Sequence, residues 1–138
     1  MSTDKSKRRK SLLKAEILSI DLLKKTIDVC SSKNNFPIRK KWAIPSDLYL
    51  EAREFTVNLQ QANNIKVTDA KTAAERLKHD AIAADHLERY IILQNTAVQA
   101  YPLGAQVIDS WDKILFDADE MFQKWYKAEK KRYEECVI

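Results

Sequence analysis

The chain has 138 residues and a formal net charge of +4, and only one of its residues is Gly. This length suits one domain and is too short for two ordinary ones. Sheets and loop-rich folds need Gly for bulges and tight turns, so its scarcity favours a helical protein. No apolar run reaches the length of about 18 residues that a bilayer-crossing helix needs.

The N-terminal residues 1–11 carry several charges but no apolar run behind them, so they do not resemble a secretory signal. The two cysteines, Cys30 and Cys136, fit a reducing compartment better than a disulfide-stabilised domain. We therefore expect a cytoplasmic protein without a disulfide. Residues 1–10 are expected to form a basic, disordered tail, and residues 11–138 the folded domain.

The first expected helix runs from about Ser11 to Ser32, with the Ser11 hydroxyl as its N-cap. Apolar residues recur along it at intervals of three or four, which places them on one face of a helix. We expect that face to be buried against the other helices. Its residues are Leu13, Ile17, Ile20, Leu23, Ile27 and Cys30.

The link to the second helix contains two prolines. Pro37 is expected to open a short helical turn, because its missing N–H costs nothing at a first helical position. Pro45 restarts the chain into the second helix and holds Ile44 extended before it. This helix is expected from about Ser46 to Ile65. Its inner face consists of Leu48, Ala52, Phe55, Leu59 and Ala62.

The third expected helix has Thr68 as its N-cap, and Asp69 favours the positive end of the helix dipole. The helix runs to about Gln99, after which Pro102 stops it and Gly104 permits a turn. We again expect the apolar residues to face inward. They are Leu77, Ala81, Ala84, Leu87, Ile91 and Val98.

The fourth expected helix runs from about Gln106 to Glu135. Four helices joined by short links, each with one apolar face, predict an all-α fold. The arrangement is an up-down-up-down antiparallel four-helix bundle. The inner face of the fourth helix consists of Ile108, Trp111, Leu115, Ala118, Phe122 and Trp125.

The sequence offers little catalytic chemistry. His79 and His86 are the only histidines, and no Glu stands three residues before either, as the Glu-x-x-His motifs of di-metal bundles require. A single Gly excludes a Gly-rich phosphate loop, and no Ser or Cys lies in a recognisable nucleophile motif. We therefore expect a protein that is not an enzyme and holds no cofactor or metal.

Positive charge is concentrated at the N-terminus, in the first link and at the end of the last helix, whereas the helix middles are acidic. Such segregation favours a polyanionic partner, although cations also suit the negative end of a helix dipole. Tyr126 and Tyr133 lie among the last group, where their rings could stack on unpaired bases. The candidate nucleic-acid-binding residues are Arg39, Lys40, Lys41, Lys124, Lys127, Lys130, Lys131 and Arg132.

An up-down bundle would place the two groups of candidates at opposite ends of the protomer. The first link lies at one end, and the fourth helix finishes at the other. A continuous binding surface would then require several protomers.

Two segments resemble the Avd-like four-helix-bundle proteins. One contains Phe36-Pro37, then Lys40-Lys41-Trp42 and Ile44, followed by a helix that ends in Ala62-Asn63-Asn64. It is similar to the family's "FP…R/K-aromatic…L…AN" region. The other contains Trp111 and, after the bundle seam, the run of residues 124–132. It is similar to the family's closing "W…(A)W-x-K-x-D-x-x-R" pattern.

The family comprises accessory proteins of diversity-generating retroelements, together with relatives encoded in intervening sequences of large-subunit ribosomal RNA genes. The resemblance implies a homo-oligomer, a pentamer in the accessory proteins, that binds RNA or DNA and associates with a reverse transcriptase. It also implies that the cations of the first link and of the final helix contact nucleic acid.

Three hypotheses remain open from the sequence. The first is a non-enzymatic, homo-oligomeric bundle that binds nucleic acid, and the second is a structural or protein-interaction bundle without that affinity. The third is a metal-dependent enzyme that uses His79 and His86. Several leftover apolar positions would serve a subunit interface or a partner surface under the first two hypotheses. These are Ile65, Val67, Val107, Ile114 and Met121.

Overall fold

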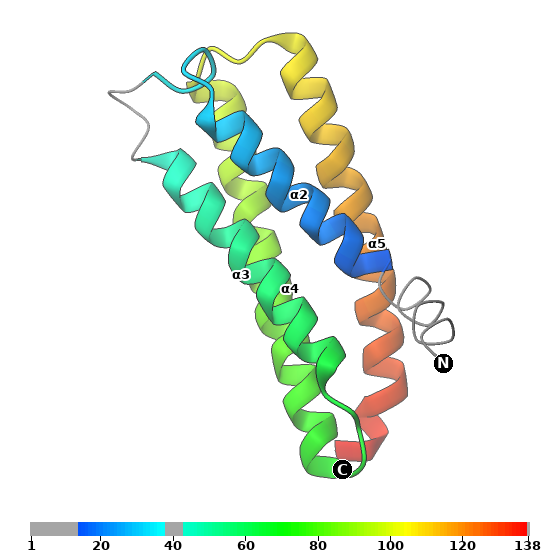
Figure 1. Ribbon diagram of the computed structural model, residues 1–138. Helices are drawn as coiled ribbons and strands as arrows, with labels where there is room; N and C mark the ends of the chain where they lie inside the picture. The colour runs from blue at the N-terminus through cyan, green and yellow to red at the C-terminus, as the bar shows by residue number, and fades with distance from the viewer. Residues whose placement is uncertain (1–13, 38–42, 138) are drawn as a thin grey trace, which may run out of the picture.

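The computed structural model describes residues 14–37 and 43–137, and these residues form four helices. Helices α3 and α4 pack together, and so do α2 with α3, α4 with α5 and α2 with α5. Figure 1 shows the four lying side by side. The all-α four-helix fold predicted from the sequence is thus confirmed. The bounds are Lys14–Ser31 for α2, Ile44–Asn64 for α3, Ala70–Ala100 for α4 and Ala105–Val137 for α5.

Successive helices run in opposite directions, so the links alternate between the two ends of the bundle. The residues that flank the α2–α3 link lie beside the α4–α5 link, and α5 finishes near the α3–α4 link at the other end (Figure 1). The ring of Phe36, which follows α2, packs edge-on against Tyr101 at 4.5 Å between centroids. Phe36 is fully buried and closes this end of the core.

The predicted inner faces of α3 and α5 are confirmed. All five predicted residues of α3 are buried, and on α5 Ile108 and Trp125 are half-buried while the other four are buried. The rings of Phe55 and Phe122 meet edge-on at 5.1 Å, which joins these two helices across the middle of the bundle. Of the leftover apolar positions, Val107, Ile114 and Met121 pack against the core, and Ile65 and Val67 are half-buried.

The predicted inner face of α2 is wrong. Ile17, Ile20 and Ile27 point outward and are 47%, 36% and 43% exposed, and Leu23 is half-buried. Only Cys30 of the described part of that face is buried, while Leu13 lies outside the described residues. The buried residues of α2 are instead Ala15, Ser19, Leu22, Thr26, Val29 and Cys30.

A buried chain of hydrogen bonds accounts for the burial of Thr26 on the inner face of α2. The indole N–H of Trp111 donates to the Tyr90 hydroxyl at 2.8 Å. The Tyr90 and Thr26 hydroxyls lie 2.6 Å apart, and the Thr26 hydroxyl donates to the Leu22 carbonyl at 2.6 Å. Tyr90 therefore donates to Thr26, and each polar group of the chain has a partner, as burial demands.

The predicted inner face of α4 is also wrong at most positions. Leu87 is buried as expected, but Ala81 is exposed and Leu77, Ala84, Ile91 and Val98 are only half-buried. The buried face of α4 is rotated by about one residue relative to the predicted face, and two of its polar side chains, Tyr90 and Gln94, form hydrogen bonds with other helices. It consists of Ala73, Asp80, Ala83, Leu87, Tyr90, Gln94 and Ala97.

Two helix starts differ from the sequence prediction. Helix α3 begins at Ile44, which is therefore helical and not extended, and Pro45 lies in its first turn. The missing N–H of Pro costs nothing there because the first amides of a helix have no intrahelical partner. The N-cap of α4 is Asp69 and not Thr68, because the Asp69 carboxylate accepts from the Thr72 backbone N–H at 2.8 Å.

We predict that Tyr90→Phe lowers the free energy of unfolding by about 1–3 kcal/mol, since it leaves the buried N–H of Trp111 without an acceptor. Urea denaturation measures this value. The matched control is Tyr49→Phe, at a tyrosine that is 42% exposed, with an expected change within about 0.5 kcal/mol. Equal effects of the two substitutions would contradict the role given to Tyr90.

Candidate nucleic-acid interface

The last turns of α5 present a group of exposed cations, which we call the cationic end. All five side chains are exposed. Three of them, Lys124, Lys127 and Lys131, follow the spacing of one helical face. The group lies where α5 finishes, beside the start of α4 (Figure 1). The cationic end consists of Lys124, Lys127, Lys130, Lys131 and Arg132.

Some of these cations already contact other side chains, and others do not. Lys124 pairs with Glu120 at 3.2 Å, one turn back on α5, and both side chains are largely exposed. Lys130 lies 4.4 Å from the centroid of the Tyr126 ring. Within the described part of the chain, Lys127 and Lys131 take part in no ion pair or ring contact. These two are the cations most available to a phosphate.

Tyr126 and Tyr133 are only partly available for stacking. Both are half-buried, and burial is the main reason that the pKa of Tyr126 is raised. The Tyr126 ring packs against Phe122, and the Tyr133 ring has the guanidinium of Arg76 5.2 Å from its centroid. A base that stacks here must use a remaining ring face or displace Lys130 from Tyr126 or Arg132 from Tyr133.

The cationic end is held in place from the inside by Arg76 of α4. Its Nε donates to the Glu129 carboxylate of α5 at 2.5 Å, and its side chain is only 11% exposed. A second nitrogen donates to the Ile65 carbonyl at 3.0 Å, and a third reaches the Asn63 side-chain oxygen at 3.4 Å. One guanidinium thus ties α4, α5 and the end of α3 together.

Asp80 lies fully buried near this ion pair. No donor among the described residues reaches either of its carboxyl oxygens. Burial and the negative charge of Glu129 raise the pKa of Asp80 to about 8, and Arg76 opposes the shift. The raised pKa favours the protonated form of Asp80, whose proton permits a hydrogen bond to Glu129 that two carboxylates could not form.

Sequence reasoning missed Arg76, Asp80 and Glu129. A signal was present for Asp80, because Ala73, Asp80, Leu87 and Gln94 recur every seven residues and all four are buried. Arg76 and Glu129 gave no such signal. They are 53 residues apart, and their pairing depends on the fold.

The candidates of the first link, Arg39, Lys40 and Lys41, lie outside the described residues. The end of α2 and the start of α3, between which this link lies, are at the end of the bundle opposite the final turns of α5 (Figure 1). The structure does not bring these flanking positions together with the final turns of α5.

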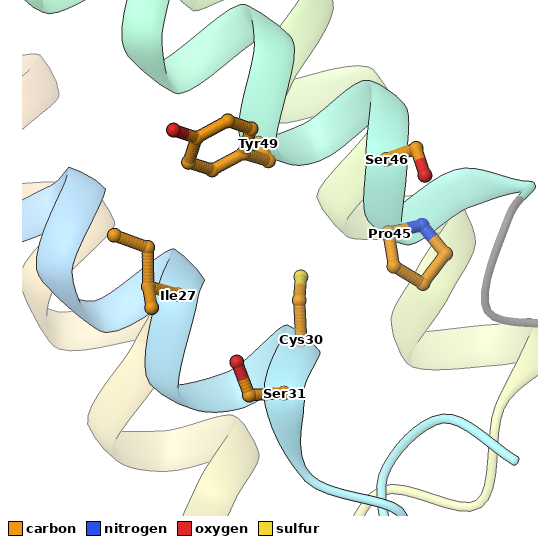
Figure 2. Close-up of a pocket in the computed structure, with 6 residues that line it drawn as sticks. All are labelled: Ile27, Cys30, Ser31, Pro45, Ser46 and Tyr49. Carbon is orange, nitrogen blue, oxygen red and sulfur yellow. The ribbon is translucent and has the colours of Figure 1, made fainter. Parts of the chain in front are cut away.

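The largely apolar hollow between α2 and α3 does not suit a phosphate. It has a volume of about 340 Å³, and none of its lining residues is charged. Figure 2 shows that α2 contributes Ile27, Cys30 and Ser31 and that α3 contributes Pro45, Ser46 and Tyr49.

The two histidines attach α4 to α3. His86 contacts the Glu51 carboxylate at 2.5 Å, and His79 contacts the Asn58 side-chain oxygen at 3.1 Å. In residues 14–37 and 43–137, no three His, Cys, Asp or Glu side chains converge as a metal site.

No protein-family model, curated protein or solved structure matches the chain. No helix in the described residues has both the length and the apolar character that crossing a bilayer demands.

We predict that Asp80 makes the folded protein less stable as pH rises. Between about pH 4 and pH 8 the folded chain keeps a proton on Asp80 that the unfolded chain has released. The free energy of unfolding should therefore fall across this range, by up to about 1.4 kcal/mol per pH unit from this group.

Urea denaturation at several pH values tests this prediction. Asp80→Asn should gain stability relative to the wild type as pH rises from about 4 to 8, because the amide does not titrate. Asp85→Asn, which removes an exposed carboxyl of the same helix, is the matched control. The same pH dependence in wild type and Asp80→Asn would contradict the assignment.

Proposed function

We propose that the chain is a non-enzymatic nucleic-acid-binding helical bundle whose contact surface is the cationic end of α5. The observation that carries the proposal is the row of exposed cations on turns anchored by Arg76 and Glu129. Phosphate contacts would supply most of the affinity, and the counterions that they release make such binding strongly salt-dependent. The flanking tyrosines add partly exposed rings for unpaired bases.

The proposal includes membership of the Avd-like family, a cytoplasmic location, a homo-oligomeric state and association with a retroelement reverse transcriptase. Its support is the sequence resemblance. Phe36 and Trp111, which belong to the resembling segments, are fully buried and therefore serve the core. The nucleic-acid binding that the resemblance implies therefore depends on the exposed cations.

A protein-interaction bundle is the second candidate function. The observation in its favour is a set of exposed large hydrophobic side chains, with Phe116 63% and Ile92 58% exposed. One experiment distinguishes the two candidate functions. A protein-interaction bundle should not bind polynucleotides even in dilute buffer, whereas a nucleic-acid-binding bundle should.

We predict that replacing Lys124, Lys127, Lys131 and Arg132 by Gln flattens the salt dependence of binding to single-stranded RNA or DNA. Loss of four phosphate contacts would reduce the slope of log K against log salt by up to about 3. A filter-binding titration at several salt concentrations measures the slope.

The matched control changes the same amount of charge elsewhere. Lys24, Lys78, Arg89 and Lys113 are exposed on α2, α4 and α5, outside the cationic end. Replacing these four by Gln should change the slope much less. An unchanged slope in the first variant, or an equal change in both, would reject the cationic end as the contact surface.

A further inference from the structure

The surface between α4 and α5 contains a groove unlike the cationic end of the same helix. Two adjacent hollows of about 350 and 480 Å³ share the lining residues Ile91 and Asp119, and we call the two together the acidic groove. Ile91 and the nearly buried Leu115 provide apolar lining. Helices α4 and α5 pack beside each other along its length (Figure 1).

Two prominent apolar side chains line this groove. Phe116 and Ile92 are 63% and 58% exposed, the highest values among the exposed large hydrophobic residues of the described chain. They belong to neighbouring hollows, so their apolar surface lies along one groove. Contiguous apolar surface of this kind marks a site of interaction.

The charges that line the groove are all negative. Glu88, Asp112 and Asp119 line it, and no Lys or Arg does so. None of the three carboxylates belongs to an ion pair within the described residues. Lys113 pairs with Asp117 instead. The polar contacts of Asp112 and Asp119 are with the amides of Gln94 and Gln123, which leave the negative charge uncompensated.

We propose that this groove binds a cationic amphipathic helix of a partner protein. Such a helix would bury its apolar face on Phe116 and Ile92 and set Lys or Arg side chains against the carboxylates. Asp112 and Asp119 are seven residues apart, or about 10.5 Å along α5. Cations two turns apart on the partner, with apolar residues between them, match this spacing.

The negative charge of the groove argues against nucleic acid as its ligand. Its carboxylates repel phosphates, so a nucleic acid at the cationic end has no favourable contact here. The inference is therefore independent of the proposed function. One helix carries two surfaces, acidic and apolar around residues 112–119 and cationic at residues 124–132.

The test uses a labelled peptide of about 18 residues, or five turns, with Leu on one face and Lys on the other. Fluorescence anisotropy at about 50 mM salt measures its binding to the wild-type protein, where screening of charge is weak. The same peptide with Glu in place of Lys should not bind. Equal binding of the Lys and Glu peptides would overturn the proposal.

Two groove variants separate the apolar from the charged contribution. Phe116→Ser with Ile92→Ser should weaken binding at least about tenfold through lost apolar burial. Asp112→Asn with Asp119→Asn keeps the acceptor oxygens for Gln94 and Gln123, and it should weaken binding about fivefold. Circular dichroism of each variant should match that of the wild type, and binding of single-stranded RNA should not fall.

Matched variants control for general loss of charge or apolar surface. Ile17→Ser with Ile27→Ser removes exposed apolar side chains from α2, and Asp28→Asn with Glu75→Gln removes two exposed carboxylates outside the groove. Both pairs should bind the peptide like the wild type. Equal losses in these controls and in the groove variants would overturn the proposal.

Sedimentation of the proteins without peptide tests whether a second copy of the chain, and not a partner helix, binds in the groove. Under the proposal, the groove variants sediment like the wild type. A self-associating wild type that Phe116→Ser with Ile92→Ser makes monomeric would assign the groove to a second copy and overturn the proposal.

Discussion

The buried guanidinium of Arg76 is the interaction on which the candidate interface depends. It binds the Glu129 carboxylate of α5 and, at the end of α3, the Ile65 carbonyl and the Asn63 side chain, so it joins α4 to two other parts of the chain. A planar donor group with several N–H groups can satisfy such a set of acceptors at once, which an ammonium on a flexible stem does less well. Removing either member of a buried ion pair leaves the other charge unpaired at a large cost. The last turns of α5 are fixed to the bundle for this reason.

The neutral state of Asp80 completes this arrangement. With Asp80 protonated, the buried cluster contains one cation and one anion, so its charges balance. Ionised Asp80 would add a second buried negative charge next to Glu129. With Asp80 protonated, the interior of this end holds no net charge, while the outer surface carries the five exposed cations together with the exposed Glu134 and Glu135. The cations on that surface gain no compensation from Glu129, which is turned inward.

The four-helix fold could be predicted from the sequence, and so could the inner faces of α3 and α5, because their inward residues are apolar. The prediction failed on α2 and α4 because several of their inward residues are polar. Thr26 is buried because Tyr90 donates to it, and Gln94 is buried where its amide donates to Asp112. Periodicity within one helix cannot reveal partners 64 and 18 residues away, so it predicts the outward Ile17 and Ile27 as core residues. The sequence predicts a group of cations at the end of α5, and the structure places their side chains on the surface, but the sequence gives no sign of their anchor at Arg76.

The central claim is that phosphates bind the outer surface of the final turns of α5. The most direct measurement is a titration of the isotopically labelled protein with a short single-stranded oligonucleotide, followed by the backbone amide signals in NMR spectra. Shifts should be concentrated in residues 124–133, and residues 84–95 and 112–119, which include the lining of the acidic groove, should be unaffected. Absence of shifts in low salt, or shifts confined to the acidic groove, would contradict it.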